Sequence, residues 1–227
     1  MPAAPLRILS TLGVHGVLQG LLPRAAEAGF APEIRFDPTV RLLAAIRDGA
    51  HGDVAILTEE GVADLTASGV LAPSPRRILA QSMVGAAVRA GAPRPDIGTE
   101  AAFIATLRAA PSVVYSASGA SGLFFAALIE RLGIAAEVNA KARIVPQGFT
   151  AEPVARGEAA LAIQQISELM AVPGVDILGP LPPSCNTTVV FAASCFTGAG
   201  AEAGRFVAWL AEAMTREALR AAGLAPA

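Results

Sequence analysis

An apolar segment that begins at residue 162 ends in three polar side chains, Gln164, Gln165 and Glu168. A second apolar segment begins at residue 175. Amide and carboxyl groups at the end of a buried strand can hold a ligand, because open α/β sheets bind ligands beyond the carboxyl ends of their strands. Neighbouring strand residues point to opposite faces, so at most one of the two glutamines can reach a given ligand directly.

The carboxyl group of Glu168 and the imidazole of His15 are the candidate groups for proton transfer. Glu168 could act as a general base or accept a hydrogen bond from a ligand hydroxyl; alternatively, it is solvated or caps a helix. His15 falls in the first turns of an expected helix, where ordinary packing is the alternative to a ligand contact. Both are predicted to be catalytic only if the chain is an enzyme. No spacing of Cys, His, Asp and Glu predicts a metal site, and no cofactor is expected.

Hydroxyl groups near expected helix starts are candidate anion ligands. Thr39 opens a helix and is expected to be its N-cap, a role compatible with anion binding because the free N–H groups of the first turn point the same way. Ser118 and Ser121 lie in the loop SASGASG before another helix, and the glycines of this loop allow a tight backbone. An ordinary capped loop is the alternative. The loop has neither the spacing of a nucleophile elbow nor the lysine of a Walker loop.

Composition limits the classes of function. Hydrophobic residues make up 53% and charged residues 16% of the 227 residues, so the chain can bury a large core. The net charge is −2 with acids and bases interspersed, which argues against the basic face that binds nucleic acid. No segment reaches the roughly 18 consecutive apolar residues of a membrane span, so no membrane insertion is expected.

The N-terminus and the cysteines bear on localisation. Polar residues interrupt the apolar segment 6–22, which argues against a signal peptide. The sequence as it stands therefore predicts a cytoplasmic protein, and a periplasmic protein if a signal has been removed. Cys185 and Cys195 flank an expected strand that is too long for a disulfide to join its ends, so both are expected to be free thiols.

Strand and helix patterns alternate along the whole chain. The expected strands are 6–11, 32–36, 52–58, 76–91, 111–117, 141–146, 159–165, 175–179 and 187–194. Helices are expected between them, with Thr99 as one N-cap, Gly49 as one stop signal and a single closing helix over 201–223. Repeated strand–helix–strand units predict a mostly parallel, doubly wound α/β arrangement.

Two long apolar strands can divide such a chain into two lobes. The segments near 79–88 and 187–194 have no flexible linker beside them and are expected to pass between lobes as a hinge. The predicted division is residues 1–82 with 188–227 for the first lobe, and 83–187 for the second.

Three segments carry a resemblance to a known family. These are IRDGAHGDVAILT at 46–58, SGASG at 118–122 and QQISELMAVPGVDILGPLP at 164–182. With the order of elements from residue 6 to 224, the chain resembles type II periplasmic solute-binding proteins. The branch that it resembles is the molybdate-binding-protein-like group of ABC transporter substrate-binding proteins, in a subgroup that resembles aconitate isomerase.

The resemblance implies a two-lobe type II fold, with a mixed, mostly parallel sheet in each lobe, flanking helices and a ligand cleft between the lobes. Molybdate binders of this branch use hydroxyl and backbone N–H groups from several loops. Their first serine loop matches 10–13, so the resemblance implies ligand positions at Thr11 and at Gly13, where their ligating serine is expected. Their second loop matches Thr39. Their cleft tyrosine falls at Gln165, and Gln147 lies in a loop that faces the cleft.

Two functions stay open at this point. The first is a solute-binding protein that holds a small anion, either an oxyanion such as molybdate or a small carboxylate, for an ABC-type transport system with a membrane component. The second is an isomerase that moves a proton within a small unsaturated polycarboxylate such as aconitate. Such a reaction needs one base that returns the proton at a neighbouring carbon, and Glu168 or His15 could supply it.

Overall fold

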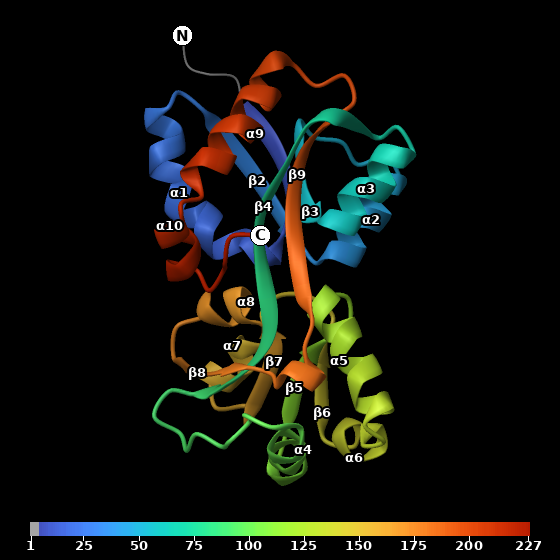
Figure 1. The fold of residues 1–227 in the computed structure, drawn as a ribbon, viewed down its shortest axis with the longest axis vertical. Helices are drawn as coiled ribbons and strands as arrows, with labels where there is room; N and C mark the ends of the chain where they lie inside the picture. Colours follow the sequence, from blue (N-terminus) through green and yellow to red (C-terminus); the bar gives the residue numbers. More distant parts are fainter. Residues whose placement is uncertain (1–4) are drawn as a thin grey trace. The chain divides into compact units, whose positions relative to one another are not determined.

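The computed structural model describes residues 5–227, and its chain divides into two compact units (Figure 1). The first unit runs to Gln81 and resumes at Val189, and the second covers Ser82–Thr188. Strands and helices alternate in both units, so the expected α/β class, with mixed and mostly parallel sheets flanked by helices, is confirmed.

The elements have the following bounds. The strands are β1 (Pro5–Thr11), β2 (Ala31–Asp37), β3 (Val54–Thr58), β4 (Leu71–Arg89), β5 (Val113–Ser116), β6 (Ala142–Val145), β7 (Leu161–Gln165), β8 (Val175–Pro180) and β9 (Thr188–Phe196). The helices are α1 (His15–Glu27), α2 (Thr39–Arg47), α3 (Glu59–Ala67), α4 (Glu100–Ala109), α5 (Ala120–Arg131), α6 (Ala135–Asn139), α7 (Ala151–Ala155), α8 (Ile166–Met170), α9 (Ala201–Ala213) and α10 (Arg216–Ala221), with short 3-10 helices η1 (Leu12–Val14) and η2 (Pro183–Cys185).

The first unit is a sheet with helices on both faces. Its strand order is β2-β1-β3-β9-β4, in which β1 is parallel to β2 and β3, while β9 is antiparallel to β3. Consecutive residues of β1 point to opposite faces of the sheet and pack into different cores. Ile8 joins the core under α1 and α9, and Leu9 joins the core under α2 and α3. This two-sided burial explains why β3 is apolar from Val54 to Leu57 and buried along its whole length, since both of its faces are covered.

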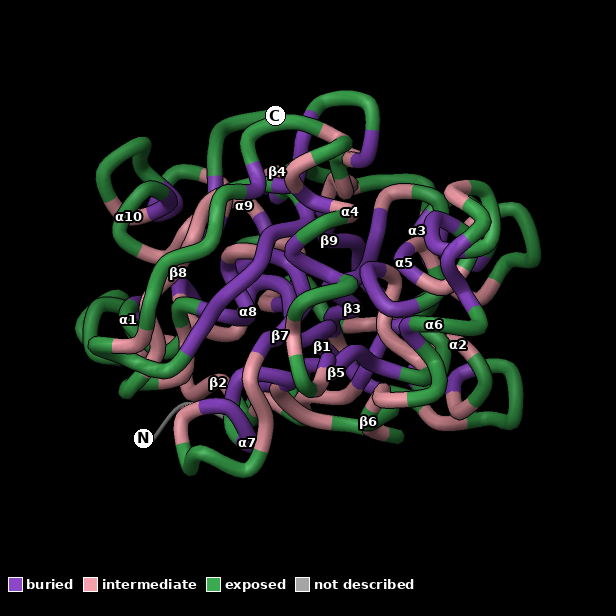
Figure 2. Tube along the Cα trace, turned by 90° about the horizontal axis from the view of Figure 1, so that it is seen from below, coloured by how far each residue is buried: buried purple, intermediate pink, exposed green. Residues whose placement is uncertain are grey.

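The second unit repeats this plan, with helices on both faces of its sheet. Its strand order is β8-β4-β7-β5-β6, in which β5 is parallel to β6 and β7, while β4 is antiparallel to β7 and β8. Helices α4, α5 and α6 cover one face, where Phe103 and Phe125 are fully buried. Helices α7 and α8 cover the other face through Val154 and Leu169. Strands β5 and β7 are therefore buried along their length (Figure 2).

Three local expectations are corrected by the structure. The long strand β4 begins at Leu71, five residues before the expected start. In its first part, the backbone carbonyls of Ala72 and Pro75 accept hydrogen bonds from Ser194 Oγ. The expected single closing helix is two helices, because Thr215 caps α10 by accepting a hydrogen bond from the N–H of Ala218. Helix α6 lies at residues 135–139, between the expected helix that ends at residue 134 and the expected strand that begins at residue 141, where no element was expected.

Several other local expectations agree with the structure. Thr99 caps α4 by accepting from the N–H of Ala102, and Gly49 ends α2 with a φ of 98°. Cys185 and Cys195 are free, as expected, and both are buried. Within residues 5–227, no helix is long and apolar enough to cross a membrane.

Candidate functional site

The carboxyl ends of three parallel strands form one polar edge of the second unit's sheet. Strand β5 ends at Ser116, β6 at Val145 and β7 at Gln165, and all three run in the same direction. The segments that follow these ends carry five of the predicted site residues: Ser118, Ser121, Gln147, Gln165 and Glu168. We call the edge formed by residues 116–122, 147–150 and 164–168 the strand-end edge. In open α/β sheets, ligands bind at such an edge.

A hydroxyl-rich turn joins β5 to α5 at the strand-end edge. Ser116 Oγ accepts hydrogen bonds from the N–H groups of Ser118, at 3.3 Å, and Gly119, at 2.9 Å. Ser118 Oγ donates to the carbonyl of Pro146 at 2.7 Å, so its hydroxyl ties this turn to the end of β6. Ser121 is 1% exposed, and its Oγ has no hydrogen-bond partner among residues 5–227. Of the two predicted serines, Ser121 is therefore the one whose hydroxyl can still form a hydrogen bond with a ligand.

The start of α5 packs directly on the end of β5. A Cβ atom on Gly122 would lie 1.9 Å from the carbonyl oxygen of Ser116, a distance that no real side chain could adopt. Only glycine allows the helix to come this close to the strand. The close contact places the free N–H groups at the start of α5 beside the loop that joins β5 to α5. Gly119 is the N-cap, and no side chain caps the helix. The uncapped N-terminus of a helix of this length attracts negative charge.

A second set of hydrogen bonds holds the loop after β6 against β7. Gln164 Oε1 accepts from the N–H of Thr150 at 2.8 Å and from its hydroxyl at 3.0 Å, while Gln164 Nε2 donates to the carbonyl of Gly148 at 3.3 Å. Gln164 therefore fixes the shape of this loop. Gln147, the predicted ligand residue of the same loop, is exposed. Sequence reasoning did not assign Gln164 this positioning role, although an amide buried at a strand end requires partners.

Gln165 and Glu168 combine a helix cap with atoms that lack partners. Gln165 is the N-cap of α8, and Glu168 is the third residue of the helix, where a carboxyl group can accept the N–H of the capping residue. Glu168 is 4% exposed and Gln165 is 2% exposed. Gln165 Oε1 and Glu168 Oε2 are buried without a hydrogen-bond partner among the described residues. The capping role and a ligand role thus coexist on different atoms.

Burial determines the protonation of Glu168. Loss of solvation raises the pKa of its carboxyl group to about 8, although hydrogen bonds from the backbone of Gln165 and the side chain of Gln164 act in the opposite direction. At neutral pH the carboxyl group therefore keeps its proton and can donate a hydrogen bond. A protonated carboxyl group at this edge does not repel an anion.

The first unit has a comparable edge at the ends of β1, β2 and β3. Thr11 ends β1, and its hydroxyl oxygen lies 3.0 Å from that of Thr39, with both side chains buried. The expectation that Thr39 is the N-cap of α2 is wrong: Pro38 is the N-cap, and Thr39 is the first helical residue. Its hydroxyl turns to Thr11 because that position is too far along the helix to cap the first turn. Gly13 is buried in η1.

Charged and aromatic residues lie close in sequence to the two threonines, in β2 and at the starts of α1 and α2. Arg41 Nε lies 3.3 Å from Asp37 Oδ1, and Arg35 Nη2 lies 3.2 Å from Asp37 Oδ2, so two guanidinium groups share one carboxylate. His15 is half-buried and packs against the ring of Phe36, with centroids 4.6 Å apart. Burial lowers the pKa of His15, so its imidazole is neutral at neutral pH. Among residues 5–227, no group of three or more His, Cys, Asp and Glu side chains could hold a metal ion.

Comparison with known proteins determines the family. A family model described as bacterial extracellular solute-binding protein matches residues 6–225. The chain is a member of this family. An aconitate isomerase from a Pseudomonas species is 34% identical over 234 residues, covering 99% of this chain and 89% of that protein. The type II periplasmic solute-binding resemblance inferred from the sequence is thereby confirmed.

Solved structures of solute-binding proteins share the fold. The periplasmic molybdate-binding protein of Azotobacter vinelandii is 19% identical, with a TM-score of 0.79 over 98% of this chain and 99% of that one. The substrate-binding domain of a putative molybdenum ABC transporter from Clostridium difficile is 11% identical, with a TM-score of 0.71 over 99% of this chain and 100% of that one. At these identities the likeness establishes the fold of this solute-binding family member and not its ligand.

Proposed function

We propose that this chain is a solute-binding protein for a small anion, and that polar groups at its strand ends bind the anion. The observation that carries the proposal is the group of buried, unpartnered atoms at the strand-end edge: Ser121 Oγ, Gln165 Oε1 and Glu168 Oε2. Buried polar atoms almost always have partners, so three such atoms at the ends of neighbouring strands indicate a bound ligand or its water.

The chemistry of this edge favours an anion held by neutral donors. Ser121 has a free hydroxyl, the first turn of α5 has free N–H groups, and Glu168 carries a proton at neutral pH. None of these groups requires a counter-charge in the apo protein, and all can donate to an oxyanion or carboxylate. Desolvated donors of this kind bind an anion more strongly than exposed ones, because water does not compete with them.

The first unit favours a carboxylate among small anions. Thr11 and Thr39 offer hydroxyl groups. Within residues 5–227, Arg35 and Arg41 form ion pairs with Asp37 alone, so their positive charges exceed the negative charge of their partner. Arginine recognises carboxylates through two parallel hydrogen bonds. This arrangement supports a small di- or tricarboxylate as the solute class, with oxyanions such as molybdate as the alternative.

The family supports the wider setting. Its description as extracellular favours a periplasmic role, which is the second of the two localisations expected from the sequence. An ABC-type transporter membrane component is the proposed partner, to which the loaded protein would deliver its solute.

A thermal-shift screen tests the proposed ligand class. Molybdate, sulfate, citrate, tricarballylate and trans-aconitate would be compared with glycerol as an uncharged control. A ligand at about 100 times its Kd should stabilise the folded chain by about 2.7 kcal/mol, which is readily measured. At least one anion is expected to raise the Tm while glycerol does not. If no anion in the panel stabilises the chain at millimolar concentration, the anion proposal is wrong.

Thr39→Ala is expected to weaken binding of the anion found in this screen by roughly five- to tenfold. The change removes one neutral hydrogen bond, which contributes about 1 kcal/mol. Thr39→Ser keeps the hydroxyl and is the matched control, so its affinity should stay near that of the wild type. Isothermal titration calorimetry measures all three proteins. Equal affinity of wild type and Thr39→Ala would show that Thr39 does not contact the ligand.

A second candidate function is proton transfer within an unsaturated polycarboxylate, favoured by the 34% identical aconitate isomerase. The reaction would take a proton from the saturated carbon beside the double bond and return it to the far carbon of that double bond, as the double bond moves by one position. The neutral imidazole of His15 is in the form that can accept a proton at neutral pH, and the protonated Glu168 is in the form that can donate one.

Proton NMR of trans- and cis-aconitate in deuterated water tests this candidate. An isomerase would interconvert the two compounds and incorporate deuterium, and Glu168→Gln should lower the rate by about 10² or more if Glu168 transfers the proton. The binding function predicts affinity without turnover. Absence of both isomerisation and deuterium uptake in the wild type would remove aconitate as a substrate.

A further inference from the structure

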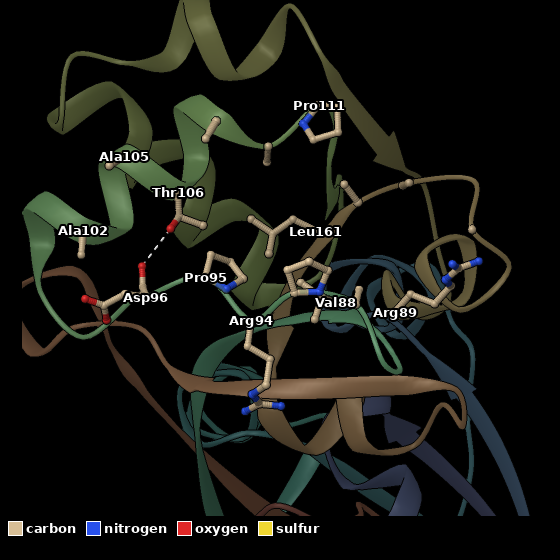
Figure 3. A pocket seen from close by; sticks show the side chains of 17 residues that line it. Val88, Arg89, Arg94, Pro95, Asp96, Ala102, Ala105, Thr106, Pro111 and Leu161 are labelled. Carbon is tan, nitrogen blue, oxygen red and sulfur yellow. Dashed lines mark hydrogen bonds between the residues drawn. The ribbon is translucent and has the colours of Figure 1, made fainter.

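A large apolar pocket lies in the second unit, away from the strand-end edge (Figure 3). Its volume is about 790 Å³. Leu161 begins β7, Pro111 precedes β5, and Val88 is near the end of the antiparallel β4, so the pocket is at the amino ends of the parallel strands. It is therefore at the opposite edge of the sheet from Ser121 and Glu168.

The walls of the pocket offer almost only apolar contact. Helix α4 presents the methyl groups of Ala102, Ala105 and Ala109, and Pro95 lies across from them (Figure 3). The hydroxyl of Thr106 also faces the pocket, but it donates to the backbone carbonyl of Asp96 at 2.8 Å. An apolar pocket of this size is typical of small-molecule sites, which bury most of a ligand in roughly 300–1,000 Å³.

Two arginines, Arg89 and Arg94, line the pocket, and the side chain of only one of them forms a hydrogen bond with another described residue. Arg94 Nη2 donates to the carbonyl of Ile177 at 2.8 Å. The side chain of Arg89 makes no hydrogen bond or ion pair with any of residues 5–227 and lies at the rim of the pocket. A Cβ atom on Gly157 would be 3.1 Å from Arg89 Nη1, so the guanidinium group rests against bare backbone. Gly157 also has a φ of 74°, a conformation that favours glycine.

Asp96 does not neutralise this site from inside. Its Oδ1 accepts the N–H of Gly98 at 2.8 Å, in a local turn. With Arg89, Arg94 and Asp96 as the charged lining residues, the pocket carries a formal net charge of +1. Apolar walls with one available guanidinium group at the rim complement a ligand that has an apolar body and one negative end.

We propose that this pocket binds an organic monocarboxylate with an apolar body. The carboxylate pairs with Arg89, and the apolar body lies between α4 and the amino ends of β5 and β7. The site is separate from the strand-end edge and does not depend on the function proposed for that edge.

The test uses 4-phenylbutyrate and its uncharged analogue 4-phenylbutan-1-ol as probes, with binding followed by amide chemical shifts. Phenylbutyrate is expected to perturb residues 88–96 and 102–111 in the wild type. Arg89→Gln should weaken phenylbutyrate binding by about tenfold and leave phenylbutanol binding unchanged, because only the acid uses the guanidinium group. Ala105→Trp, on the exposed side of α4, should block both probes by filling the pocket.

Arg77→Gln is the matched control, since Arg77 is an exposed arginine of the first unit and its loss changes the net charge by the same amount. It should leave both probes unaffected. The proposal is overturned if phenylbutyrate does not bind, if Arg77→Gln weakens it as much as Arg89→Gln does, or if Arg89→Gln weakens both probes equally. Tight binding of phenylbutanol without phenylbutyrate would also overturn it and would indicate an uncharged occupant, such as an apolar side chain of another protein.

Discussion

Replacing Gly122 with alanine is expected to destabilise the second unit by about 3 kcal/mol or more. The new Cβ atom would lie 1.9 Å from the carbonyl oxygen of Ser116, and both groups belong to the backbone framework, so neither α5 nor β5 can move without losing contacts. For a chain of this length, the Tm should fall by roughly 6–12 °C. Differential scanning calorimetry measures this change directly.

Gly20→Ala is the matched control for this experiment. Gly20 lies inside α1, and, apart from its chain neighbours and the backbone of its own helix, no atom is within 4 Å of the position that its Cβ would take. Alanine is a better helix former than glycine by up to about 1 kcal/mol, so the control should leave the Tm unchanged or raise it. Gly122→Ala should also weaken anion binding, because it displaces the start of α5. A Gly122→Ala protein with the wild-type Tm would show that α5 does not pack on β5 as described.

Glu168→Gln is expected to change the dependence of stability on pH. Burial raises the pKa of Glu168 from 4.5 to about 8, so between these values the folded chain keeps a proton that the unfolded chain releases. The free energy of unfolding of the wild type should therefore fall as pH rises from about 4.5 to about 8, by up to about 5 kcal/mol from this group. Glu168→Gln cannot titrate, so its unfolding free energy should decline less and exceed that of the wild type near pH 8.

The same substitution should also alter the dependence of anion binding on pH. Glutamine resembles a protonated glutamate in shape and in having one acceptor and one donor group. Anion affinity should therefore be similar in both proteins at pH 7. Above about pH 8 the wild type gains a buried negative charge at the strand-end edge and should lose up to about tenfold in affinity per pH unit, whereas Glu168→Gln should not.

Glu212→Gln is the control for both measurements, since Glu212 is an exposed carboxylate of α9. Urea unfolding followed by circular dichroism, and calorimetric titration with the anion, would be carried out between pH 5 and 9. Identical pH profiles for the wild type and Glu168→Gln would contradict a buried carboxyl group that holds its proton near neutral pH.

The fold class followed from the sequence because its signals are local and periodic. Alternating apolar strands and helices, together with signals such as the Thr99 cap and Gly49, were sufficient to predict an α/β arrangement. The break between α9 and α10 was missed although a signal was present: Thr215 is a residue type favoured at N-caps, and Glu217 is an acid in the first turn. The helical pattern of apolar residues continues across the break, so the sequence predicted one helix instead of two.

The candidate site was less accessible to sequence reasoning because its hydrogen bonds join distant parts of the chain. The residue types at 116–122 and 164–168 indicated a polar strand end. However, the partner of Thr39 is Thr11, 28 residues earlier, and the partner of Gln164 is Thr150. Only the paired strands bring these groups together, so sequence spacing could not show which hydroxyl and amide groups already have partners.

Amide chemical-shift mapping with the anion that gives the largest thermal shift tests the central claim most directly. The claim is that the strand-end edge of the second unit binds the anion. The largest perturbations are expected at residues 118–122, 147–150 and 165–168. Perturbations confined to residues 88–96 and 102–111, or no perturbation at a saturating anion concentration, would contradict it.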